Sequence, residues 1–333
     1  MRYTNLGRTG LTVSRLCLGT MTFGFQCDEE TSFSIMDAAY DADISFWDTA
    51  NVYPLGGGLD HVGRTEQIIG KWMRQRKRRR EDIVLATKCV GRMGPNRWEQ
   101  GASRKHVLTA VEDSLRRLGT DYVDLYQLHS DDTRTPLEEQ MEALDLVVRS
   151  GKARYVGCSN FLAYRMARAN GIAAARHLVR FDSVQPRYNM LFRQIERELL
   201  PLCDEESIGV IPYNPLAGGL LSGKHSRTAP PETGTRFTIG TAGGLYQERY
   251  WHEREFDTVD AVRALAAEAG MSMVTMSVAW VLANPTITAP IVGASKASQL
   301  AENVAALDVT LDADLKRRLD ELTHDFRFGD ATR

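Results

Sequence analysis

The chain contains 333 residues, of which 43% are hydrophobic and 25% are charged, and its formal net charge is -2. These values are ordinary for a globular protein and exclude a disordered, collagen-like or disulfide-scaffold protein. The balanced charge also argues against a nucleic-acid partner, because such binding usually requires a strongly basic face.

The first predicted element is a β-hairpin over residues 3–13, with a glycine-containing turn at residues 7–10. From residue 16 onward, short apolar runs typical of buried strands alternate with longer stretches that have apolar residues at helical spacing. The predicted strands cover residues 16–18, 44–47, 83–86, 122–128, 153–157, 181–184, 209–213 and 289–292. The clearest helices cover residues 31–42, 106–118 and 137–149, and Gly119 and Gly151 are placed to end the last two.

Strands that alternate with helices predict a parallel sheet, because parallel neighbours need a long crossover. Eight such units favour an α/β fold of the (β/α)8 TIM barrel type, as a single domain over residues 1–333 with the hairpin across its N-terminal mouth. A doubly wound sheet is disfavoured because no Gly-x-Gly-x-x-Gly motif occurs. Residues 51–63 and 216–250 interrupt the pattern, and we expect them to be long loops at the C-terminal face.

Three further features concern the environment of the protein. The basic run over residues 74–80 is followed at once by two acidic residues, so we favour a solvated helix end over a phosphate-binding patch. The five cysteines form no Cys-x-x-Cys spacing, and we expect reduced thiols in a cytoplasmic protein. The N-terminal residues lack the apolar core of a signal peptide, and no stretch approaches the roughly 18 apolar residues of a membrane span, so we expect no membrane association.

Polar side chains follow three consecutive predicted strands. Asp48 and Tyr53 follow the second strand, Lys88 the third and His129 the fourth. Because a barrel brings the carboxyl ends of its strands onto one face, we expect these four residues to be neighbours. Each residue alone could be a structural hydrogen-bonding group, but four at consecutive strand ends favour a catalytic site. No second histidine ends a nearby strand, so we expect no metal at His129.

These four residues can perform general acid catalysis. The ordinary pKa of tyrosine is about 10, so a tyrosine that donates a proton near pH 7 needs a neighbour that stabilises its phenolate. Lys88 can supply this stabilisation, Asp48 can hold the lysine ammonium, and His129 can hydrogen-bond to a substrate oxygen. The set suits an acid that protonates an oxygen as hydride reaches carbon, but it does not identify the hydride donor. Alternatively, Lys88 could form a Schiff base as in a lyase.

Ordered segments across nearly the whole chain resemble the aldo-keto reductase superfamily. They are residues 18–21 (LGTM), 46–53 (FWDTANVY), 63–66 (GRTE), 86–88 (ATK), 114–118 (SLRRL), 121–129 (DYVDLYQLH), 157–160 (GCSN), 185–189 (QPRYN), 213–220 (YNPLAGGL) and 293–296 (GASK). Residues 293–303 (GASKASQLAEN) are most similar to the branch that includes aflatoxin-aldehyde reductases and potassium-channel β subunits. One departure is the longer link over residues 54–62, which puts the shape of the substrate pocket in question.

The resemblance implies a barrel that binds an extended nicotinamide cofactor without a dinucleotide motif. It implies that Tyr53 is the proton donor, that Lys88 and Asp48 tune it, and that His129 orients a substrate carbonyl. A histidine at this position accompanies carbonyl reduction in the family, whereas glutamate accompanies reduction of carbon-carbon double bonds. The activity implied is the reversible reduction of an aldehyde or ketone to an alcohol.

The resemblance also implies the cofactor contacts. Ser159, Asn160 and Gln185 would hold the carboxamide, and Tyr213 would stack on the nicotinamide. The pyrophosphate would contact Leu216, Gly218, Lys224 and Arg236. The ribose 2′-phosphate would contact Ser295, Lys296 and Gln299, and the adenine would contact Glu302 and Asn303. Gly19, Thr20, Met21, Asp48, Asn214, Pro215 and Gly293 complete the implied set. Lys296 favours NADPH over NADH, with dual use left open.

Our sequence-based hypothesis is therefore an NADPH-dependent oxidoreductase that acts on a small-molecule carbonyl substrate. A second hypothesis is a regulatory or redox-sensing subunit that binds NADP(H), as some members of the resembled branch are. The segment Gly-x4-Gly-Lys that ends at Lys224 is not a phosphate-binding loop of the nucleotide-hydrolase type, because His225 replaces the required hydroxyl residue.

Overall fold

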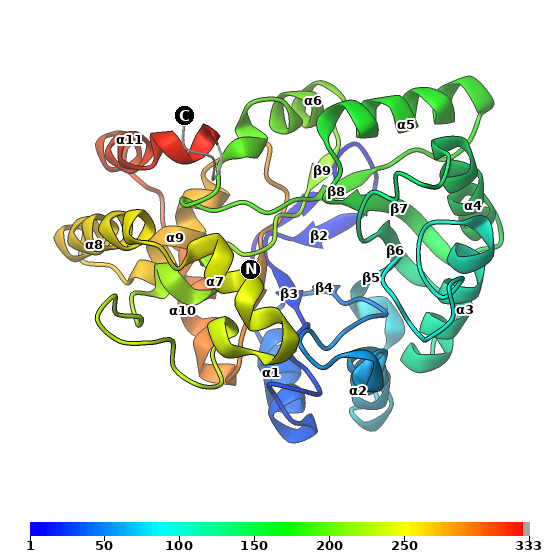
Figure 1. Cartoon of the computed structure of the whole chain (residues 1–333), viewed down its shortest axis with the longest axis horizontal. Coiled ribbons are helices and arrows are strands. Elements are labelled where there is room, and N and C mark those ends of the chain that lie inside the picture. The colour runs from blue at the N-terminus through cyan, green and yellow to red at the C-terminus, as the bar shows by residue number, and fades with distance from the viewer. Residues whose placement is uncertain (329–333) are drawn as a thin grey trace.

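Eight parallel strands form one curved sheet in the computed structural model, which describes residues 1–328 (Figure 1). In their order across the sheet, the strands are β10 (Ile291–Gly293), β3 (Cys17–Gly19), β4 (Phe46–Asp48), β5 (Val84–Cys89), β6 (Val123–Leu128), β7 (Ala153–Ser159), β8 (Ser183–Gln185) and β9 (Gly209–Val210). The backbone amides of Thr288 and Ile291 donate to the carbonyls of Val210 and Pro212, so β9 also bonds to the segment that leads into β10. The parallel α/β architecture and the positions of all eight strands are as predicted.

The helices lie outside the sheet (Figure 1). Within the described residues the α-helices are α1 (Glu29–Asp41), α2 (Arg64–Gln75), α3 (Arg104–Leu118), α4 (Leu137–Arg149), α5 (Ala163–Arg176), α6 (Leu199–Glu205), α7 (Gly243–Tyr250), α8 (Glu253–Glu268), α9 (Met273–Leu282), α10 (Leu300–Ala305) and α11 (Ala313–Leu322). Gly119 ends α3 in the left-handed conformation, as predicted. The segment over residues 216–250, expected as a loop, contains α7.

The N-terminal hairpin is confirmed. Strands β1 (Tyr3–Asn5) and β2 (Thr12–Ser14) pair antiparallel. Leu6 and Val13 are fully buried in an apolar cluster whose other members come from the inside of the curved sheet. Gly7 has a φ of 55°, and a side chain there would overlap the backbone at the start of β9. The hairpin therefore packs against the N-terminal end of the sheet.

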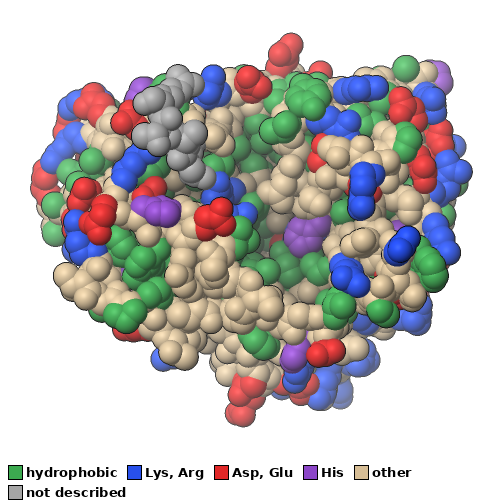
Figure 2. All heavy atoms as spheres, viewed as in Figure 1, with side chains coloured by type: hydrophobic (Ala, Val, Ile, Leu, Met, Phe, Trp, Pro, Cys, Tyr) green, Lys and Arg blue, Asp and Glu red, His purple; other side chains and the backbone are tan. Residues whose placement is uncertain are grey.

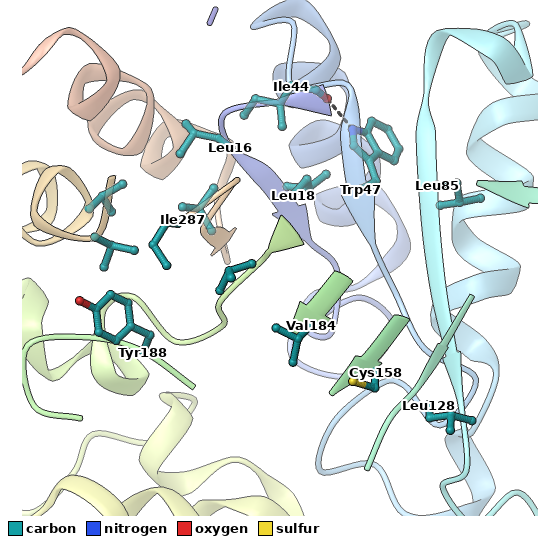
Figure 3. Close-up of a cluster of buried hydrophobic side chains, with 14 of the residues drawn as sticks. Leu16, Leu18, Ile44, Trp47, Leu85, Leu128, Cys158, Val184, Tyr188 and Ile287 are labelled. Carbon is teal, nitrogen blue, oxygen red and sulfur yellow. Dashed lines mark hydrogen bonds between the residues drawn. The ribbon is translucent and has the colours of Figure 1, made fainter. Parts of the chain in front are cut away.

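A large apolar layer fills the space between the sheet and its helices, and Figure 3 shows part of it. Trp47 of β4 lies in this layer, where its indole N–H donates to the carbonyl of Ile44 at 2.6 Å. Its ring also packs against Trp72 of α2, with 4.9 Å between ring centroids. The burial of such large side chains gives β4 and its neighbours a rigid support, because close-packed interiors deform little.

Helix α9 belongs to this buried layer, since all residues from Met273 to Val281 are buried. No single helix in residues 1–328 combines the length and the hydropathy of a membrane span. Helices α8 and α9 meet those criteria only when they are taken together, and they join at a bend of 96°.

Candidate active site

The polar residues at the strand ends are positioned by the period-two alternation of the strands. Phe46, Ala86 and Leu125 belong to the apolar cluster inside the sheet. Two positions further along β4, β5 and β6, the side chains face the same interior but lie at the carboxyl ends of the strands. These side chains are Asp48, Lys88 and Gln127.

Lys88 and Asp48 form a buried ion pair. The Lys88 Nζ lies 2.6 Å from Asp48 Oδ2, and the Lys88 side chain is 0% exposed. The same ammonium group donates to the carbonyl of Thr49 at 2.8 Å and lies beside Tyr53, with 5.0 Å between Nζ and the centre of the tyrosine ring. Burial lowers the pKa of Lys88, but Asp48 and Tyr53 outweigh this effect, so that the pKa is raised above its ordinary value. Lys88 is therefore held as a cation by its hydrogen bonds to Asp48 and Thr49.

The second oxygen of Asp48 is also engaged. Gln185 Nε2 donates to Asp48 Oδ1 at 2.8 Å, and Gln127 Nε2 donates to it at 3.2 Å. The carboxylate thus bridges three strands besides its own and cannot turn away from Lys88. Gln127 lies in the segment of residues 121–129 that carries the family resemblance, and the structure shows that it helps to hold the Lys88–Asp48 pair in place.

Tyr53 lies above this pair and is buried. The Lys88 Nζ is 5.0 Å from the centre of its ring, and the His129 ring is 5.6 Å away in an edge-to-face arrangement. Burial raises the pKa of Tyr53, whereas the nearby positive charge of Lys88 lowers it, and the net direction is upward. Tyr53 is therefore protonated at neutral pH, which is the form that an acid requires.

His129 is neutral at pH 7. Burial and the positive charge of Lys88 lower its pKa from 6.5 to about 3. A neutral imidazole can donate one hydrogen bond to a substrate oxygen without competing with Tyr53 for the role of acid. The structure thus brings all four predicted residues together.

A cavity of about 480 Å³, here called the catalytic cavity, opens above these residues. Figure 2 shows a hollow beside α7, near the middle of the face seen in Figure 1. Its lining includes Asp48, Tyr53 and His129 together with Thr20, Met21, Ser159, Asn160 and Gln185 of the predicted cofactor set. Val52, Pro54, Leu55, Leu59, Val62 and Leu245 add apolar walls.

Ser159, Asn160 and Tyr213 form one hydrogen-bonded network at the wall of this cavity. The Ser159 hydroxyl donates to the Gln185 carbonyl at 2.7 Å, and Asn160 Nδ2 donates to the Ser159 hydroxyl at 3.0 Å. The Tyr213 hydroxyl donates to Asn160 Oδ1 at 2.8 Å. Asn160 has a φ of 57°, a conformation that asparagine tolerates better than most side chains. The network gives this wall a fixed polar edge.

A second cavity of about 390 Å³, here called the cofactor groove, adjoins the first, because Gly19, Met21, Tyr213 and Ile291 line both. Predicted cofactor residues dominate its lining: Asn214, Pro215, Leu216, Gly218, Lys224, Arg236, Gly293, Ser295, Gln299, Glu302 and Asn303. Lys296 is the exception, since its side chain is exposed and does not line the groove.

Three side chains of the cofactor groove carry buried polar atoms that have no hydrogen-bond partner within the described part of the chain. These atoms are Asn214 Nδ2, Arg236 Nη1 and Asn303 Oδ1. Buried polar groups in native proteins are nearly always paired, so these atoms call for a polar ligand or ordered water. The residues of the groove therefore fit an extended, polar and anionic molecule such as a nicotinamide dinucleotide.

The sequence reasoning missed several residues of the catalytic cavity. Tyr246 and Arg249 reach it from α7, and Arg92 reaches it from the loop after β5. No local pattern identified them, because α7 lies in a segment without clear periodicity and starts with two glycines. Its position depends on contacts with distant residues; for example, Gln247 Nε2 donates to the carbonyl of Phe237 at 2.7 Å.

Together these groups can protonate an oxygen at the inner end of the catalytic cavity, beside a groove suited to a dinucleotide.

The Aldo/keto reductase family profile matches residues 15–324. An uncharacterized oxidoreductase of Bacillus subtilis, YrpG, is 42% identical over 327 residues, which cover 97% of this chain and 96% of that protein. A probable voltage-gated potassium channel subunit beta of Oryza sativa subsp. japonica is 37% identical, and the aligned residues cover 93% of this chain and 92% of that protein. The aldo-keto reductase dtxS3 of Metarhizium robertsii is 34% identical, and the aligned residues cover 96% of this chain and 90% of that protein. The chain therefore belongs to the aldo-keto reductase family.

Proposed function

We propose that the protein is an NADPH-dependent reductase of aldehydes or ketones in which Tyr53 donates the proton. The observation that carries this proposal is the Lys88–Asp48 pair beneath Tyr53 and His129, at the junction of the catalytic cavity and the cofactor groove. When bound, NADPH would supply hydride to the substrate carbon. The five buried, unpaired cysteines are compatible with our proposal that it acts in the cytoplasm.

The chain's own residues then act on the substrate oxygen. The neutral His129 ring donates a hydrogen bond that orients the carbonyl, and the Tyr53 hydroxyl gives its proton to the same oxygen as negative charge develops there. Lys88 stabilises the phenolate that remains, because Asp48 and Thr49 hold its ammonium beside Tyr53. The apolar walls exclude water and so strengthen each of these interactions.

For the cofactor, the proposed contacts follow the lining of the groove. Lys224 and Arg236 would meet phosphate charge, and Tyr213 would lie against the nicotinamide. Ser295 and Gln299 would meet a 2′-phosphate, with Lys296 at the rim. Binding of NADPH and NADH to the purified protein, measured by fluorescence quenching, tests this assignment. We expect tighter binding of NADPH, and we expect Lys224→Gln and Arg236→Gln each to weaken it; equal affinity for both cofactors would contradict the preference.

The proposed reaction is tested by NADPH absorbance with a panel of aromatic aldehydes, methylglyoxal, sugars and keto-steroids. Oxidation of NADPH that depends on one of these substrates is the expected result. NADPH binding without turnover of any substrate would instead favour the regulatory subunit, a role consistent with the name of the potassium-channel relatives. A Schiff-base lyase is disfavoured, because the Lys88 amine would have to be neutral, whereas its environment raises its pKa.

A further inference from the structure

The catalytic cavity contains two arginines that the proposed reaction does not use. Arg249 lies in the last turn of α7 and is partly buried, and Arg92 is an exposed residue of the loop after β5. Both line the same cavity as Tyr53 and His129. Neither lines the cofactor groove, whose own cations are Lys224 and Arg236. These two arginines are therefore placed toward the substrate.

Neither arginine has an acidic partner within 4 Å among residues 1–328, whereas many other arginines of the surface are paired. The one carboxylate that lines the catalytic cavity, Asp48, already accepts from Lys88, Gln127 and Gln185. The catalytic cavity thus holds two positive charges without a counter-ion from the described part of the chain. Such a site attracts an anion, because an arginine can form charge-assisted, bidentate hydrogen bonds to a carboxylate.

Arg92 and Arg249 are both more exposed than Tyr53, the proposed proton donor. Arg92 is anchored near the mouth, where its Nε donates to the Gly94 carbonyl at 2.9 Å and its Nη2 to the Pro95 carbonyl at 3.3 Å. Tyr53, by contrast, is buried. The lining of the cavity also includes apolar side chains such as Leu59 and Leu245, which are 42% and 44% exposed. A fitting ligand has a carbonyl at one end, an apolar body and an anionic group at the other.

We propose that Arg92 and Arg249 bind the carboxylate of the substrate, so that the preferred substrates are apolar aldehydes or ketones that carry a carboxylate distant from the carbonyl. This inference rests on the proposed reductase function for the position of the carbonyl. The placement of Arg92 and Arg249 in the cavity does not depend on that function, because it rests on the lining of the cavity alone.

The test compares 4-carboxybenzaldehyde with its neutral methyl ester, methyl 4-formylbenzoate, in the wild type, Arg92→Gln, Arg249→Gln and the double variant. Arg97→Gln is the matched control, since Arg97 is an exposed arginine of the same loop that does not line the cavity. We expect kcat/KM to favour the carboxylate by roughly tenfold or more in the wild type and in Arg97→Gln. We expect the ratio to fall to about one in the double variant. A wild type without preference, or an unchanged ratio in the double variant, would overturn the inference.

Calorimetry separates this inference from the reductase function. The NADP+-loaded protein is titrated with 4-(hydroxymethyl)benzoate, the alcohol that corresponds to the acid substrate. If neither aldehyde is reduced, the proposed function fails, and binding alone then decides the second question. Binding of 4-(hydroxymethyl)benzoate that the double variant loses supports the arginine site. No binding, or equal binding by the double variant, overturns it.

Discussion

The ammonium nitrogen of Lys88 lies 2.6 Å from Oδ2 of Asp48, and neither side chain is more than 4% exposed. Charges buried in this way are costly to separate, because the remaining partner cannot recover its hydration. Tyr53 and His129 lie next to this pair, so the stability of the fold and the proposed activity both depend on the contact between Lys88 and Asp48.

Removing only Lys88 should therefore be more damaging than removing both charges. We expect Lys88→Met to lower the free energy of unfolding by about 3–5 kcal/mol, since it leaves Asp48 buried and uncompensated. The double variant Asp48→Asn, Lys88→Met should recover most of this loss, because asparagine can still accept from Gln127 and Gln185. Guanidinium denaturation of the wild type, Asp48→Asn, Lys88→Met and the double variant measures these free energies. A double variant as unstable as the sum of its single variants would contradict this account.

The neutral state of His129 has a consequence for acid stability. Its pKa of about 3 in the folded protein lies below the ordinary 6.5. The unfolded chain therefore binds a proton that the folded chain does not, so stability is fully present above pH 6.5 and is lost as the pH falls toward 3. Between pH 8 and pH 5 the wild type should lose about 1–2 kcal/mol more than His129→Gln. Thermal unfolding of both proteins at the two pH values measures this difference. Equal losses of stability in the two proteins would show that burial does not lower the pKa of His129.

The long segment over residues 54–62 is joined to the segment that precedes α7. The amide of Thr241 donates to the carbonyl of Gly56 at 3.2 Å. Gly240 has a φ of 41°, and a side chain there would overlap that Gly56 carbonyl. We expect Gly240→Ala to separate the two segments, alter the mouth of the catalytic cavity and weaken NADPH binding several-fold, with little change in global stability.

Gly244→Ala is the control for this loop variant. Gly244 lies in α7, and a side chain there meets no atom within 4 Å. Because alanine has a higher helix propensity than glycine, Gly244→Ala should stabilise α7 slightly and leave NADPH binding unchanged. Fluorescence titration compares the two variants. If the two variants bind NADPH equally, the contact between Gly56 and Thr241 does not influence cofactor binding.

Much of this arrangement could be predicted from the sequence, for a definite physical reason. Asp48, Lys88 and His129 lie at the carboxyl ends of strands of a parallel sheet, so their common location can be predicted from strand order alone. Arg92, Tyr246 and Arg249 follow no such rule. They stand on a loop and on a short helix whose placement depends on tertiary contacts, and these contacts leave no periodic signal in the chain. The same limit applies to Gln127, because its bond to Asp48 is decided by side-chain geometry across three strands.

The central claim is that the Tyr53 hydroxyl is the proton donor, and Tyr53→Phe tests it most directly. The variant removes one oxygen atom and keeps the ring against His129 and Lys88. The measurement is the steady-state rate of NADPH oxidation with an aldehyde substrate, together with the Kd for NADPH. We predict that kcat falls by about 10²- to 10⁴-fold while the Kd changes by no more than a few-fold. Wild-type turnover in Tyr53→Phe would contradict the account.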